Sequence, residues 1–104
     1  GGIVQQFLPY KSKTITHDPV ERELQRLKKY PGMPSNIIDG KRIPREYYDL
    51  MLIIGGKDAK NKLTSLNFSD YYQTLSDIQK LKKIENTIDS AREKARNQIR
   101  GMLQ

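Results

Sequence analysis

Residues 76–102 read SDIQKLKKIENTIDSAREKARNQIRGM, and this stretch decides the fold. Ser76 with Gln79 three residues later is typical of a capping box, in which a hydroxyl and an amide satisfy free N–H groups at a helix start. Apolar residues then recur three or four positions apart, with an interruption at Gln98. They are Leu81, Ile84, Ile88, Ala91, Ala95 and Met102. The stretch therefore predicts a long amphipathic C-terminal helix.

The apolar face of this helix is the predicted protein-interaction surface. The small side chains of Ala91 and Ala95 would let another helix approach closely, either from the same chain or from a neighbour. A homo-oligomer built through this face is the alternative to packing within one chain. The predicted interaction residues are Leu81, Ile84, Ile88, Ala91 and Ala95.

A shorter helix is predicted near the start of the chain. The sequence DPVE at residues 18–21 supplies an oxygen-bearing cap, a proline at the first helical position and an acid in the first turn. Val20, Leu24 and Leu27 follow at helical spacing, and the helix is expected to end near Lys29, before Pro31.

The middle of the chain predicts a turn and two further helices. Asp39-Gly40 between short apolar flanks indicates a small β-hairpin within residues 37–43. Pro44 begins a helix whose end is expected at Gly55-Gly56, since glycine readily adopts the left-handed conformation that closes helices. A separate helix is expected from Asp58 to Leu66.

These patterns together predict a mainly α fold. We expect a bundle of three to five helices with a long C-terminal helix and a minor hairpin near residues 37–43. Residues 18–104 form the predicted helical domain, and residues 1–17 lack a helical period and are predicted to be an extended arm or linker. Gly1-Gly2 without an initiating methionine indicates a piece of a longer chain.

Composition argues against catalysis. The chain has no cysteine and one histidine, His17, so neither a thiolate site nor a catalytic triad is indicated. Asp39 is better explained by its position in a turn, and Asp49 by its position on the solvent-exposed side of a helix, than as a catalytic pair. We predict no catalytic residue, no metal site, no cofactor and no membrane span, since no apolar run approaches about 20 residues.

The net charge of +7 favours anionic partners. The cations are spread along the chain, and a solvated surface explains them as well as a nucleic-acid footprint does. DNA binding by the basic C-terminal helix is therefore the alternative function. The residues predicted to carry it are Lys82, Lys83, Arg92, Arg96 and Arg100.

A spaced pattern across residues 18–96 resembles a segment toward the ends of very large phage and prophage proteins, of the internal-virion, genome-ejection or tape-measure kind. It includes Asp18-Pro19-Val20, Met33-Pro34-Ser35, Tyr48-Asp49, Ala91-Arg92 and Ala95-Arg96. The resemblance implies no active site. It implies a virion component located in the virion or the host bacterial cytoplasm, with other segments of the parent protein or other virion proteins as partners.

Residues 34–56 are also similar to the middle of an AT-rich-interaction (ARID) DNA-binding domain. The similarity is carried by Gly40-Lys41, by residues 48–50 (Tyr-Asp-Leu) and by Gly55-Gly56. The tryptophan that follows the paired glycines in that family is absent. The function favoured by the sequence is a non-enzymatic structural or assembly module, with nucleic-acid binding as the alternative.

Overall fold

The computed structural model describes residues 18–104, which form a mainly α fold with one small hairpin. The predicted fold class, the long C-terminal helix and the hairpin are confirmed. The predicted arm at residues 1–17, and His17 with it, lies outside the described residues. The elements are α1 (Pro19–Arg26), β1 (Ile37–Ile38), β2 (Lys41–Arg42), α2 (Arg45–Asn67), α3 (Asp70–Gln73) and α4 (Asp77–Met102).

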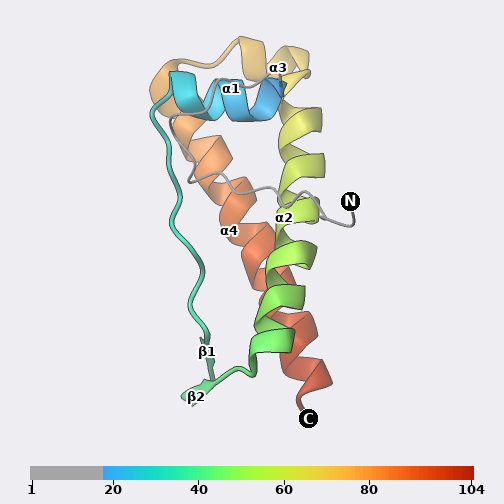
Figure 1. Cartoon of the computed structure of the whole chain (residues 1–104). Helices are drawn as coiled ribbons and strands as arrows, with labels where there is room; N and C mark the ends of the chain where they lie inside the picture. The colour runs from blue at the N-terminus through green and yellow to red at the C-terminus, as the bar shows by residue number, and fades with distance from the viewer. Residues whose placement is uncertain (1–17) are drawn as a thin grey trace.

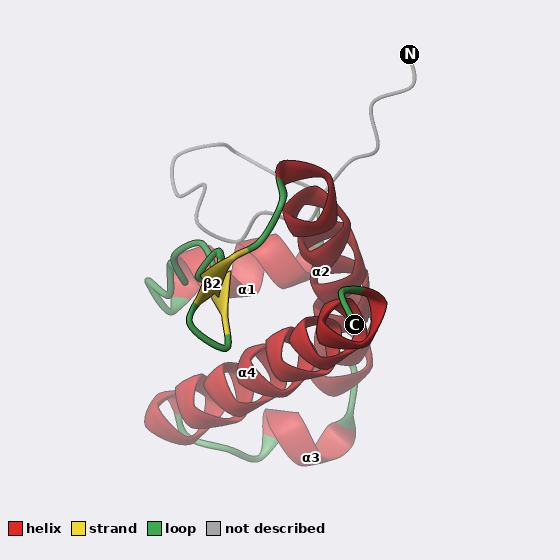
Figure 2. Ribbon diagram, turned by 90° about the horizontal axis from the view of Figure 1, so that it is seen from below, coloured by secondary structure: helices red, strands yellow, loops and turns green. Residues whose placement is uncertain are grey.

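The two long helices, α2 and α4, run side by side in opposite directions and form the body of the fold (Figure 1). The short helices α1 and α3 lie at the end where α2 finishes and α4 begins. The β1–β2 hairpin lies at the other end, near the start of α2 and the C-terminus, and a long connection from α1 descends to it (Figures 1 and 2). In the hairpin, Ile37 pairs with Arg42 and Ile38 with Lys41.

Gly55-Gly56 does not end a helix, and the two helices predicted on either side are one continuous α2 of 23 residues. A Cβ atom at position 55 would lie only 3.4 Å from the Cβ of Ala95, so α2 approaches α4 closely at this glycine. Glycine lowers helix propensity by roughly 1 kcal/mol. Packing against α4 outweighs that local cost, because helices in proteins are stabilised mainly by tertiary contacts.

The predicted helix starts are confirmed in atomic detail. The Asp18 carboxylate accepts hydrogen bonds from the Val20 amide at 2.8 Å and the Glu21 amide at 3.3 Å. The capping box of α4 is present, with the Gln79 amide donating to the Ser76 hydroxyl at 3.2 Å and the Ser76 amide donating to the Gln79 side chain at 3.0 Å. Both caps depend on residues within one turn, which is why the sequence alone reveals them.

The core follows the inner face of α4 from one end of the fold to the other. Near α1 and α3 it holds Val20, Leu24, Ala59, Leu63, Tyr72, Ile84, Ile88 and Ala91, and near the hairpin it holds Ile38, Ile43, Met51, Ala95 and Ile99. Ile99, which is fully buried, was missed in the sequence because the period seemed to break at Gln98. Met102, which was assigned to the same apolar face, is instead 51% exposed, because it lies in the last turn of α4.

A partly buried polar contact joins α1 to α3, and its exposed side extends to α4. The Tyr72 hydroxyl donates to the Glu23 carboxylate, and the Arg26 guanidinium donates to the same carboxylate at 2.7 Å and to Asp77 at 3.1 Å. The hydrogen bond from Arg26 holds the pKa of Glu23 below its ordinary value, although partial burial opposes this shift. Burial, together with the adjacent Glu23 carboxylate, raises the pKa of Tyr72, so the phenol stays protonated as the donor.

Candidate docking groove

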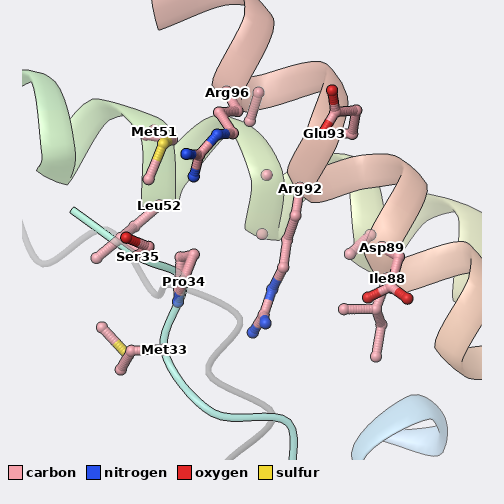
Figure 3. A pocket seen from close by; sticks show the side chains of 14 residues that line it. Met33, Pro34, Ser35, Met51, Leu52, Ile88, Asp89, Arg92, Glu93 and Arg96 are labelled. Carbon is pink, nitrogen blue, oxygen red and sulfur yellow. The ribbon is translucent and has the colours of Figure 1, made fainter. Parts of the chain in front are cut away.

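A groove with a volume of about 400 Å³ lies between α2, α4 and the connection from α1 to β1 (Figure 3). We call residues 29–36 of this connection the strap; they contain neither helix nor strand. The groove is lined by Met33, Pro34 and Ser35 of the strap, by Met51, Leu52, Gly55, Gly56 and Ala59 of α2, and by Ile88, Asp89, Arg92, Glu93, Ala95 and Arg96 of α4.

The helical period explains why these residues share one groove. On each helix the lining positions recur four residues apart, or next to such a position, so they fall on a single face. The glycines at positions 55 and 56 and the nearby Ala59 carry little or no side chain, which leaves space above α2 that a larger residue would fill. The groove therefore has an apolar base, and its charged residues all come from α4.

Three arginines of α4, spaced four residues apart, hold the strap and hairpin in place. Arg92 donates to the carbonyl oxygen of Gly32, and Arg96 donates to the carbonyl oxygen of Ile37. Arg100 donates to the Asp39 carboxylate at 2.9 Å. From α2, the Tyr48 hydroxyl donates to the carbonyl oxygen of Pro34 at 2.7 Å. Side chains, rather than a backbone ladder, thus bind the strap to the helices.

Arg92 extends from α4 toward the strap (Figure 3). Burial lowers its pKa from the ordinary value, while the negative charge of Asp89 and the nearby Tyr48 act in the opposite direction. An arginine remains protonated at any physiological pH. Its charge is therefore sheltered and directed at a backbone carbonyl of the same chain.

The structure divides the five residues predicted for nucleic-acid binding between two places. Arg92, Arg96 and Arg100 bind the strap and hairpin. Lys82 and Lys83 are exposed near the start of α4, where the Lys83 ammonium lies 5.4 Å from the centre of the Tyr71 ring. The guanidinium groups are thus already engaged as donors, which no local pattern in the sequence indicates.

The residues predicted for protein interaction mostly contribute to the chain's own core. Ile84, Ile88, Ala91 and Ala95 are buried, and Leu81 is half-buried. The close helix approach expected at the small alanines is present at Ala95, where the neighbour is Gly55 of α2 in the same chain. A partner would contact Ile88 and Ala95 only through the groove that they line.

The described residues offer no constellation for metal binding. Within residues 18–104, no group of three or more Asp, Glu, His or Cys side chains is placed to hold a metal ion. Asp39 and Asp49 each pair with an arginine, Arg100 at 2.9 Å and Arg45 at 3.2 Å respectively. Over the same range, none of the helices has the length and apolar character needed to cross a bilayer.

No family model, curated protein or solved structure matches this chain. The resemblances to phage virion proteins and to ARID domains therefore stay predictions.

Replacing Arg96 and Arg100 together by glutamine is expected to loosen the hairpin. Each substitution removes a charge-assisted hydrogen bond, so the free energy of local opening of residues 37–43 should fall by roughly 1–3 kcal/mol. If the segment closes faster than its open amides exchange, this change makes amide exchange about 5- to 150-fold faster. Hydrogen–deuterium exchange followed by mass spectrometry measures this directly.

The matched control for this prediction is the Lys82→Gln, Lys83→Gln double variant. This control also removes two positive charges from α4, but at exposed positions away from the hairpin. Exchange in residues 37–43 should be unchanged in the control. Equal exchange in the two double variants would show that the arginines do not hold the hairpin.

Proposed function

We propose that this chain is a non-enzymatic structural or assembly module that binds another protein segment in the groove between the strap, α2 and α4. The observation that supports the proposal is the groove itself: an open, largely apolar hollow of about 400 Å³ formed by three separate segments. Pockets of roughly 300–1,000 Å³ are typical of specific binding sites. The groove can accept one or two large apolar side chains from a partner.

The lining supports a peptide-like partner. Met33 and Met51 provide flexible, polarisable side chains that adapt to different apolar shapes. Met33 is 49% exposed although it borders the groove, so a bound side chain would cover it further. Binding would then be driven chiefly by removal of apolar surface from water.

The charged residues that line the groove indicate a second property of the partner. Arg92 and Arg96 donate to carbonyl oxygens at Gly32 and Ile37. The side chains of Asp89 and Glu93 are exposed to solvent, and the charge of Asp89 also acts on Arg92. The acidic groups are therefore the ones available to a ligand. The favoured partner segment carries a bulky apolar residue with a basic residue beside it.

Nucleic-acid binding is the less favoured alternative. Three of the five cations predicted for it already serve the strap and hairpin. Phosphate contacts by the remaining surface would produce affinity that falls steeply with salt. The phage-virion context, in which the partner is another part of the parent protein or virion, is an expectation from the sequence and does not enter the argument from the groove.

Substitution of Leu52 by glutamate is expected to abolish most peptide binding in the groove. Peptides selected from a random library for binding to the full chain should share a bulky apolar residue. Leu52→Glu should lower the affinity of these peptides at least about tenfold, because it places a charge in the apolar base of the groove. Isothermal titration calorimetry on the enriched peptides measures the change.

The control is Asn61→Glu, which creates the same charge at an exposed position farther along α2. It should leave peptide affinity unchanged. Failure to enrich any peptide, or equal weakening by the two variants, would count against a docking function for the groove. Salt-sensitive binding of duplex DNA that is lost in the Lys82→Gln, Lys83→Gln variant would favour the alternative.

A further inference from the structure

We infer that the groove's occupant in the free chain is the chain's own N-terminal sequence Phe7-Leu8-Pro9-Tyr10, an inference that rests on the proposed docking function. The segment would bind in the same molecule and act as an intramolecular competitor of the partner. Three features of the described residues and of the sequence carry this inference: the position at which the described chain begins, the chemistry of the segment and the charges left available in the groove.

The described chain begins beside the groove. The Asp18 carboxylate caps α1 and binds the Lys60 ammonium of α2, and Lys60 directly follows Ala59, which lines the groove. Tyr10 precedes Asp18 by eight residues, and an extended chain spans about 3.3 Å per residue, so this connection reaches about 26 Å. From Met51 to Ala59, α2 rises by only about 12 Å. The connection is therefore longer than the stretch of α2 that lines the groove.

The segment has the composition that the groove favours. Phe7, Leu8 and Tyr10 supply bulky apolar side chains, and Pro9 restricts the backbone, which lowers the entropy lost on binding. Lys11 follows immediately, and residues 1–17 contain no acidic residue. This sequence matches the preferred partner pattern of an apolar residue beside a base.

The available charges in the groove complement this segment. With Arg92 donating to the strap and Arg96 donating to the hairpin, the exposed carboxylates of Asp89 and Glu93 are the charged groups of the groove that can attract a lysine. A second copy of the chain is a poorer occupant because each copy carries a net charge of +7, which opposes association. A short tether instead gives an effective concentration in the millimolar range, so even weak contacts favour occupation in cis.

Photo-crosslinking of the full chain tests the inference. p-Benzoylphenylalanine placed at position 7 in place of Phe7 reacts with C–H bonds near its ring, and methionine side chains are good acceptors. We expect monomeric products joined to Met33, Met51 or Leu52, identified by mass spectrometry. The same probe placed at Tyr71, an exposed residue at the far end of the fold, should give none of these products.

Two variants give the matched comparison. Leu52→Glu should lower the yield of these products about tenfold, because a charge in the groove disfavours an apolar occupant by at least that factor, whereas Asn61→Glu should leave the yield unchanged. A product that joins two copies, a product at other positions only, or no product would overturn occupation by the same chain.

Peptide affinity separates this inference from the proposed function. In the full chain, Phe7→Ser with Leu8→Ser should tighten binding of the selected peptides, by about tenfold if the segment fills the groove nine-tenths of the time. The control Ser12→Ala should have no effect. If Leu52→Glu weakens peptide binding but the Phe7→Ser, Leu8→Ser double variant leaves peptide affinity unchanged, the docking function stands and the N-terminal occupant is rejected.

Discussion

Replacement of Tyr72 by alanine is expected to lower the free energy of unfolding by about 3–5 kcal/mol, the range found when large aromatic residues are removed from a core. Tyr72 is 1% exposed and packs in the cluster that holds Leu24, Leu63 and Ile84, where α1, α2 and α4 meet. Its hydroxyl donates to Glu23, so the substitution removes both a large apolar contact and a partially buried hydrogen bond.

The neighbouring residue is the control for this prediction. Tyr71 is 56% exposed, and Tyr71→Ala should change the free energy of unfolding by no more than about 0.5–1 kcal/mol, because a surface substitution loses little packing. Tyr72→Phe keeps the ring and should cost about 1 kcal/mol for the lost hydrogen bond. Tyr72→Phe also keeps the experiment informative if Tyr72→Ala leaves too little folded protein to measure.

Urea denaturation followed by far-ultraviolet circular dichroism gives the three values. The expected order of destabilisation is Tyr72→Ala, then Tyr72→Phe, then Tyr71→Ala. Equal losses at the two tyrosines would contradict the burial of Tyr72. Such a result would also remove the reason for the ordered junction between α1 and α4, since that junction depends on the Tyr72 ring and on the Glu23 contact.

The adjacent tyrosines show why a local sequence pattern does not predict which side chains are buried. Tyr71 and Tyr72 are adjacent and of the same residue type, yet only Tyr72 is buried. Two neighbours on a short helix point in different directions, and which one faces inward depends on where α1 and α4 lie. Helix caps such as Ser76 and Asp18 are different, because the groups they satisfy lie within three residues along the chain.

The groove could not be predicted for the same reason. It depends on contacts such as that between Arg92 and the carbonyl oxygen of Gly32, which are 60 residues apart in the chain. The four-residue spacing of Arg92, Arg96 and Arg100 is visible in the sequence, and it places the three arginines on one side of a helix. The spacing does not indicate whether these arginines bind phosphate groups or acceptors of the same chain, such as the carbonyl oxygens of Gly32 and Ile37 and the Asp39 carboxylate. Only the position of the strap decides between the two.

Gly55→Leu is expected to be strongly destabilising, by about 3 kcal/mol or more, because the new side chain would overlap α4. A Cβ at this position already lies 3.4 Å from the Cβ of Ala95 and 3.9 Å from the carbonyl oxygen of Ala91, so a further three carbon atoms require the helices to separate. The separation would also deform the groove, which Gly55 and Ala95 both line. Urea denaturation measures the loss of stability.

Gly55→Ala distinguishes this packing role from the helix-ending role that the sequence indicated. At 3.4 Å the added methyl group makes an ordinary contact, and alanine gains up to about 1 kcal/mol over glycine within a helix, so the variant should be neutral or slightly stabilising. A glycine that ended a helix with a positive φ would behave differently. Alanine would then cost about 1 kcal/mol through backbone strain, and leucine would cost little more than alanine.

Ala95→Gly supplies the second half of the test. Removing the opposing methyl group opens space beside position 55, so the Gly55→Leu, Ala95→Gly double variant should recover part of the lost stability. The coupling between the two sites is expected to be about 1–2 kcal/mol, within the range for residues in direct contact. Additive losses would mean that leucine destabilises α2 by itself. Coupled losses would place the cause in the contact between α2 and α4, the same contact that keeps α2 continuous through two adjacent glycines.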